Sequence, residues 1–155
     1  PVYIRTGRSV VQNITKPDKK FKIGKGLILS RGKKICIVST GNQTNIAFAA
    51  IKKLKSERIN ITLIHMPTIK PVDEKLLINQ AKKHKIIITF EDHNILGGLG
   101  SAVCEVLSEK CPIKIIRMGV KDKIGKSAEA KVLLKKYNID ENSLIKNVKK
   151  ILNNG

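Results

Sequence analysis

The sequence predicts an α/β domain of three layers, with a mostly parallel five-stranded sheet, one antiparallel edge strand and helices on both faces. Short β-branched apolar runs alternate with longer stretches of helical spacing, which is typical of a parallel sheet covered by helices. The runs are continuously apolar, as in strands that are buried on both faces. They are KICIVST (34–40), INITLIHM (59–66), KIIITF (85–90) and IKIIRM (113–118).

The fifth strand is expected just before these runs. The segment GLILSRGKKICIV (26–38) contains two β-runs joined by RGKK, which has the composition of a tight turn. Because a tight turn reverses the chain, we expect residues 27–30 to lie antiparallel beside the first parallel strand.

Four helices are expected between and after the strands. The first covers residues 44–56, and the second begins at Asp73, an acceptable N-cap. The third follows the glycines at 97–100, and the last lies near residues 143–152. The residues expected to face inward are, in chain order, Ile46, Ala49, Ala50, Lys53 and Leu54; Leu76, Leu77 and Ala81; Val103, Val106 and Leu107; and Leu144, Val148, Ile151 and Leu152.

The N-terminal residues stand outside this alternation. PVYIRTGR (1–8) is β-like, whereas QNITKPDKKFKIG (12–24) is polar and poor in regular patterning. We therefore expect residues 1–8 to end a preceding domain, residues 9–26 to form a linker and residues 27–155 to form the α/β domain. Since the chain begins at Pro1 without an initiator Met or an apolar leader, we interpret it as a soluble fragment of a longer chain, with no membrane partner.

The chain is strongly basic, with a net charge of +19 at pH 7. Such a charge attracts nucleic acid phosphates, but aromatic residues make up only 3% of the chain and Trp is absent, so bases would find little to stack on. Lysines dominate the basic residues and are spread along the whole length, as expected for solvated helix faces. Nucleic acid is therefore not expected as a partner.

The three cysteines, Cys36, Cys104 and Cys111, are odd in number and show no CxxC spacing. This usage indicates a reduced, cytoplasmic protein.

Two glycine-containing motifs resemble phosphate-binding loops without matching them. GVKDKIGKS (119–127) has five residues between its glycines where the phosphate loop has four, and an extra residue misdirects the loop amides. GGLGSAV (97–103) has Val103 in place of the third glycine of the dinucleotide fingerprint. We interpret its small residues as allowing the helix to pack closely against the sheet or a partner.

Glu91, Asp92 and His93 follow a predicted strand, at the sheet edge where open α/β proteins place their sites. No Ser or Cys nucleophile has a partner at recognisable spacing, and the three histidines lack metal-ligand spacing. A turn whose side chains cap the next helix or face a neighbour is favoured over catalysis, although the individual roles of the three residues stay open.

Several segments resemble one family in the expected order. STGNQTNIAFAAIKKLKSERINITLIHMPTIKPVDEKLL (39–77) resembles the C-terminal domain of transketolases, where strand, helix and strand lead into a loop of the MPTIKPxD kind. FEDHNILGGLGSAVCEVLSE (90–109) resembles the next strand–glycine–helix unit of that family, and IGKSAEAKVLLKKYNID (124–140) resembles the loop and short helix after it. PVYIRTGR resembles the last strand of the preceding pyrimidine-binding domain. The resemblance is greatest to the split-gene or short-subunit form of transketolase.

This resemblance implies a function for the complete enzyme. Transketolases transfer a two-carbon ketol unit between sugar phosphates, and they bind thiamine diphosphate and a divalent metal (Mg or Ca) between other domains of a dimer. The resemblance implies no catalytic, cofactor-binding or metal-binding residue in this fragment, which should be inactive alone and have a structural and interface role. The expected partners are the thiamine-binding domains of the same enzyme, in a dimer or dimer of heterodimers.

One substrate contact is implied within the chain. By the resemblance, Arg5 at the end of Val2-Tyr3-Ile4 binds the phosphate of the sugar substrate, and Arg8 is a second candidate. Deoxyxylulose-phosphate synthases and the beta subunits of 2-oxo-acid dehydrogenases share this domain, so they remain alternatives. A free-standing module that binds nucleotide through residues 119–127, or a polyanion through the lysines, is the alternative of a different class.

The stretch from Ile95 to Val103 is poor in lysine and would expose an apolar patch. We therefore expect the glycine-rich helix and the residues before it to face another domain or subunit, an expectation that fails if Leu96 and Leu99 are both fully exposed or both fully buried in this domain.

Overall fold

A computed structural model describes residues 1–4, 10–15 and 21–153 of the chain. It contains five strands and five helices in these residues: β1 (Leu27–Ser30), β2 (Ile35–Ser39), α1 (Asn42–Ser56), β3 (Thr62–His65), α2 (Glu74–Ala81), β4 (Ile86–Asn94), α3 (Leu99–Lys110), β5 (Lys114–Val120), α4 (Ala130–Lys136) and α5 (Glu141–Asn153). No helix in the described ranges is long and apolar enough to cross a membrane.

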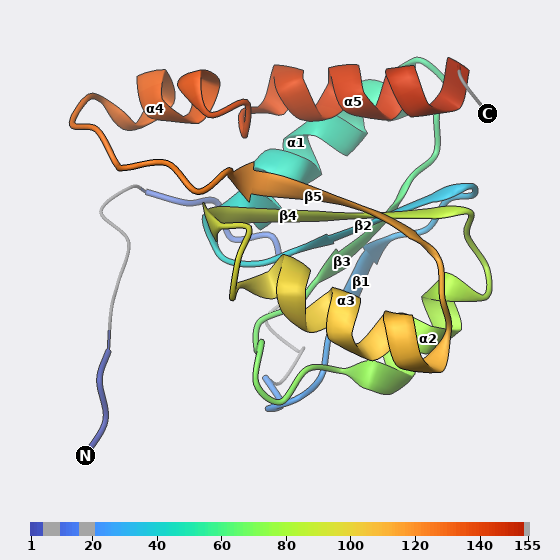
Figure 1. Ribbon diagram of the computed structural model, residues 1–155. Helices are drawn as coiled ribbons and strands as arrows, with labels where there is room; N and C mark the ends of the chain where they lie inside the picture. The colour runs from blue at the N-terminus through green and yellow to red at the C-terminus, as the bar shows by residue number, and fades with distance from the viewer. Residues whose placement is uncertain (5–9, 16–20, 154–155) are drawn as a thin grey trace.

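The sheet has the strand order β1-β3-β2-β4-β5, in which β2 to β5 are parallel and β1 is antiparallel to β3. The helices α1, α4 and α5 lie over one face of this sheet, and α2 and α3 lie over the other (Figure 1). The predicted fold class, including the antiparallel edge strand, is confirmed.

Each face of the sheet has its own apolar core. Alternate side chains of β2, such as Ile37 and Cys36, enter opposite cores, because successive strand residues point to opposite faces. All five residues of β2 are buried, as the continuous apolar run predicts.

The partner predicted for β1 was wrong. Leu27 and Ile28 pair with His65 and Ile64 of β3, so β3 lies between β1 and β2 and RGKK does not close a hairpin. The connection instead crosses the start of β3, where Gly32 N donates to Thr62 Oγ1 at 2.9 Å. The buried residues of β3 need a strand on each side to satisfy their backbone groups, and β1 and β2 supply one each.

The inward face predicted for α1 was partly wrong. Ala50 and Leu54 are buried as expected, together with Ala47 and Ile51, but Lys53 is exposed. Burying the charge of Lys53 would be costly, and its Nζ stays at the surface, 2.9 Å from Glu141 Oε1 of α5.

The remaining helices agree with the sequence patterns. Asp73 caps α2, because its Oδ1 accepts from Leu76 N at 3.1 Å. The inward positions predicted for the second, third and last helices are buried or half-buried. The short helix expected within residues 124–140 is α4.

The N-terminal residues do not join the sheet. Residues 1–4 form no strand and are exposed, and they lie away from the β-sheet in Figure 1. Because a strand is stable only when a neighbour completes its hydrogen bonds, the β-like composition alone does not form one here. Residues 5–9, which include Arg5 and Arg8, lie outside the described residues.

Candidate functional site

The chain reverses its direction of travel across the sheet between β2 and β4. From β2 it passes through α1 to β3 on one side, whereas from β4 it passes through α3 to β5 on the other. In open α/β sheets a crevice forms outside the carboxyl ends of the strands at such a point, and ligands commonly bind there. The candidate site is therefore the carboxyl edge between β2 and β4.

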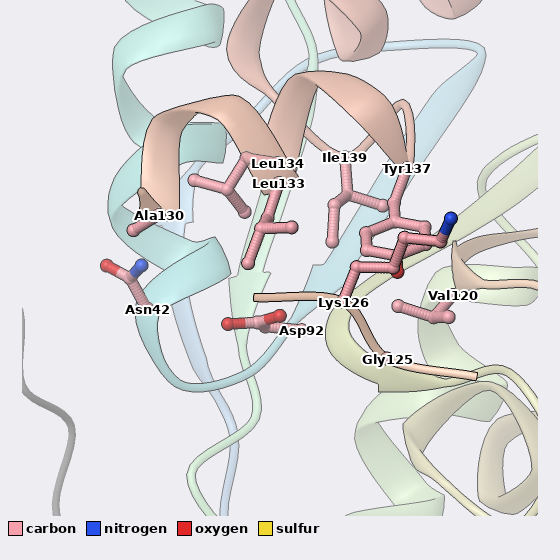
Figure 2. A pocket seen from close by; sticks show the side chains of 10 residues that line it. All are labelled: Asn42, Asp92, Val120, Gly125, Lys126, Ala130, Leu133, Leu134, Tyr137 and Ile139. Carbon is pink, nitrogen blue, oxygen red and sulfur yellow. The ribbon is translucent and has the colours of Figure 1, made fainter. Parts of the chain in front are cut away.

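A cavity of about 270 Å³ lies at this place, and we call it the carboxyl-edge cavity. Figure 2 shows Asp92, from β4, below Leu133 and Leu134 of α4, with Lys126 and Tyr137 to its right. The complete lining is Asn42, Asp92, Val120, Gly125, Lys126, Ala130, Leu133, Leu134, Tyr137 and Ile139. Its polar groups are one carboxylate, one ammonium, one amide and one phenol, which can hold a small polar molecule but include no Ser or Cys nucleophile.

Glu91, the first member of the predicted acid and histidine cluster, is completely buried. Its Oε2 accepts from Leu99 N at 2.7 Å, and its Oε1 accepts from Gly100 N at 2.8 Å. These are the first N–H groups of α3, which have no partner within the helix. Glu91 thus caps α3 from the preceding strand, as the sequence favoured, and the negative charge suits the positive end of the helix dipole.

The glycines of this region make room for Glu91. A Cβ atom at Gly98 would overlap Glu91 Oε2, and one at Gly119 would lie 3.2 Å from Glu91 Cγ. At Gly100 a Cβ would lie 2.9 Å from Arg117 Cδ and 3.0 Å from Thr89 Oγ1. The packing role predicted for GGLGSAV is therefore confirmed.

The other two members of the cluster are exposed, although a Cβ atom at Gly98 would lie 3.0 Å from His93 Nδ1 as well as overlapping Glu91 Oε2. Asp92 lines the carboxyl-edge cavity, while His93 Nδ1 lies 2.8 Å from the Asn94 carbonyl oxygen. Asn94 Nδ2 donates to Asp122 Oδ1 at 3.0 Å, which joins the end of β4 to the loop after β5. The three side chains therefore have different surroundings: Glu91 caps α3 inside the fold, and Asp92 and His93 face solvent.

A second polar network, which the sequence analysis missed, follows β2 and β3. Ser39 Oγ lies 3.1 Å from Thr44 Oγ1, and Thr44 Oγ1 lies 2.9 Å from His65 Nδ1. Burial lowers the pKa of His65 below its ordinary value of 6.5. Polar residues at two successive strand ends were the available signal, but only the sheet order shows that these strands are neighbours.

The structure agrees that GVKDKIGKS is not a phosphate loop. Gly125 lies in an exposed segment with open space around its α-carbon, and α4 begins only at Ala130. Phosphate loops place their amides at the start of a helix, and here no helix starts next to the second glycine.

Within the described ranges, no group of three or more His, Cys, Asp or Glu residues could hold a metal ion.

Leu96 and Leu99, which lie between β4 and the first turn of α3, differ in burial. Leu99 is completely buried in the core that α2 and α3 form with the sheet, so it is not available to a partner. Because Leu99 N donates to Glu91 Oε2, the first turn of α3 lies against the sheet and the Leu99 side chain packs in the core. Leu96, in the preceding loop, is 52% exposed.

Comparisons with known proteins agree on one family. Residues 24–144 match the family described as transketolase, C-terminal domain. The chain is 38% identical over 151 residues to a transketolase C-terminal section from Methanocaldococcus jannaschii, covering 96% of this chain and 47% of that protein. It is 34% identical to a 1-deoxy-D-xylulose-5-phosphate synthase from Clostridium tetani, covering 98% of this chain and 25% of the synthase.

Solved structures agree with this assignment. A split-gene transketolase described as an inactive beta4 tetramer superimposes with a TM-score of 0.86 at 39% identity, over 92% of this chain and 47% of that one. A transketolase from Campylobacter jejuni, at 15% identity and a TM-score of 0.61, shares the fold. This chain thus spans about half the length, or less, of the relatives that it matches.

Proposed function

Because this chain belongs to the transketolase C-terminal domain family, we propose that it is the C-terminal part of a transketolase that transfers a two-carbon ketol unit between sugar phosphates. The observation that carries the proposal is the 39% identity, with a TM-score of 0.86, to a split-gene transketolase. In the complete enzyme, thiamine diphosphate with Mg or Ca would supply the carbanion chemistry from other domains.

The proposed role of residues 27–155 is structural, and the fragment alone is expected to be inactive. Supporting this role, the buried acid at the carboxyl edge, Glu91, is fully engaged in capping α3. The exposed loop that carries Leu96 is proposed to face the thiamine-binding domains, in a dimer or dimer of heterodimers. Residues 1–8 would then complete the pyrimidine-binding domain, with residues 9–26 as the linker, and the complete protein would be cytoplasmic.

Arg5 is proposed to bind the phosphate of the sugar substrate, with Arg8 as a second candidate. Arginine suits this role because it offers paired donors and a permanent charge. In the complete enzyme, Arg5→Ala should reduce kcat/KM for phosphorylated sugars by roughly 10- to 100-fold, through loss of one charge-assisted contact. Steady-state kinetics with phosphorylated and unphosphorylated acceptors test this, and an equal loss for both kinds would show that Arg5 does not bind the phosphate.

A second candidate reaction is supported by the 34% identity to a 1-deoxy-D-xylulose-5-phosphate synthase. The complete enzyme, loaded with thiamine diphosphate and Mg, should be given either a ketose phosphate with an aldose phosphate, or pyruvate with a triose phosphate. Ketol transfer without release of CO₂ supports the transketolase assignment. Condensation with release of CO₂ overturns it in favour of the synthase.

A further inference from the structure

A basic cavity lies at the amino-terminal edge of the sheet, away from the carboxyl-edge cavity. Its residues come from the β1–β2 connection, the α1–β3 connection and the last turn of α5. The lining is Arg31, Gly32, Lys33, Lys34, Arg58, Ile59, Asn60, Ile61 and Leu152, around about 670 Å³. We call it the amino-edge cavity. It is a wide hollow that is open to solvent, and its four cationic side chains are exposed.

The charges of this cavity have one sign. Four of its lining side chains, Arg31, Lys33, Lys34 and Arg58, are cationic, and none of the lining residues is acidic. In the described part of the chain, the ion pairs are made by other lysines, and neither Arg31 nor Arg58 donates a side-chain hydrogen bond. The four cations are therefore available to an anion.

The arginines of the chain are few, so their position is informative. The chain has 31 Lys and Arg residues, of which only five are Arg, and two of these five line the amino-edge cavity. Guanidinium groups bind phosphate oxygens through paired donors, which an ammonium group cannot do. A cavity with two guanidinium and two ammonium groups therefore has the donor set for a molecule with more than one phosphate.

The backbone that carries these side chains is held in place by hydrogen bonds. Gly32 N donates to Thr62 Oγ1 at 2.9 Å, and Lys33 N donates to the Asn60 carbonyl oxygen at 3.2 Å. A Cβ atom at Gly32 would overlap the Asn60 carbonyl, so the two connections touch directly. The loop with Arg31 and the loop with Arg58 are thus fixed side by side before any ligand binds, which reduces the entropy lost on binding.

Arg58 occupies a position that normally favours glycine. Its φ is 62°, and the turn is closed by Arg58 N to the Lys55 carbonyl at 2.9 Å and by Ile59 N to the Leu54 carbonyl at 2.9 Å. Helices commonly end on glycine in this left-handed conformation, because a Cβ atom makes it costly. The residue found here instead places a guanidinium at the cavity.

A second basic cavity, beside β5, is less suited to bind an anion. It is lined by Arg117, Lys121, Lys123 and Lys136, among others, in about 290 Å³. Its one arginine is already engaged, since Arg117 Nη1 donates to the Ile95 carbonyl oxygen at 3.0 Å.

We propose that the amino-edge cavity binds a small molecule that carries two or more phosphate groups, with Arg31 and Arg58 as the main phosphate ligands. Ile59, Ile61 and Leu152 form the apolar part of the lining, against which the body of such a molecule packs. This site is separate from Arg5 and from the carboxyl edge, and it does not rest on the ketol transfer proposed above.

The test is calorimetric titration of the 155-residue chain with tripolyphosphate in about 150 mM NaCl, where charges more than about 8 Å apart are largely screened. The variant is Arg31→Gln with Arg58→Gln. The matched control is Lys82→Gln with Lys83→Gln, which removes the same charge from two exposed residues that follow α2 and lie outside the cavity. Circular dichroism with heating checks that both variants fold like the parent.

The parent should bind tripolyphosphate at a single saturable site. The arginine variant should bind at least about tenfold more weakly, because two charge-assisted contacts are lost, and the lysine control should change less than about twofold. Equal weakening in both variants would show a diffuse attraction and overturn the proposal. Absence of saturation, or saturation by duplex DNA but not by tripolyphosphate, would overturn it as well.

Discussion

Replacement of Glu91 by alanine should destabilise the domain more than any change at an exposed acid. The side chain is completely buried and its two oxygens accept from Leu99 N at 2.7 Å and Gly100 N at 2.8 Å. Glu91→Ala leaves both N–H groups without their partner at a buried helix end, where water does not readily replace it.

The magnitude follows from these two contacts. A hydrogen bond to a charged group contributes about 1.5–3 kcal/mol, so losing two costs about 3–6 kcal/mol of stability. The substitution also removes the unfavourable free energy of burying a carboxylate, which reduces the net loss. We expect a loss of about 3–4 kcal/mol in the free energy of unfolding, which for a chain of this size lowers Tm by about 10 °C. Glu91→Gln keeps one acceptor oxygen and should lose about half as much.

Urea denaturation followed by circular dichroism measures these losses, with Glu105→Ala as the control on the same helix. Glu105 is exposed, so this control should change the free energy of unfolding by no more than about 0.5 kcal/mol. A loss below about 1 kcal/mol for Glu91→Ala, or a Glu91→Gln variant as stable as the parent, would refute the argument that a buried carboxylate holds the start of α3.

Three further outcomes are expected. Gly32→Ala should destabilise the fold by roughly 2–4 kcal/mol in the same urea assay, because its Cβ meets backbone at Asn60 rather than a movable side chain, and a neutral effect would contradict this packing. Burial lowers the pKa of His65, so below pH 6.5 the unfolded chain binds a proton that the folded chain does not. Stability should therefore fall as pH drops through this value, and the fall should be smaller in His65→Gln; an equal fall in His65→Gln and the parent would contradict this. Burial raises the pKa of Cys36 to about 12, so with Cys104 and Cys111 replaced by Ser, a thiol reagent at pH 8 should label Cys36 only after denaturation, and rapid labelling of the folded chain would contradict its burial.

Part of the candidate site could be predicted from the sequence. The apolar run before Glu91 and the glycines after it predict a strand that passes to a helix, and an acid at that junction is suited to cap the helix. The sequence could not separate Glu91 from Asp92, because adjacent residues on a strand point to opposite sides. Only the structure shows that one caps α3 and the other lines a cavity.

Local pattern by itself determined the number and type of the parallel strands, the cap at Asp73 and the fold class, since these depend on residues close together in the chain. The neighbour of β1 was decided by tertiary structure, because the RGKK connection is compatible with a hairpin until β3 takes the place beside β2. The inward face of α1 depends on how the helix packs against the sheet and α5, which buries Ala47 and Ile51 and leaves Lys53 exposed beside Glu141. Arg31 and Arg58 both line the amino-edge cavity, although 26 residues separate them in the chain. No periodicity in the sequence predicts that they are neighbours, because their proximity depends on the order of the strands in the sheet.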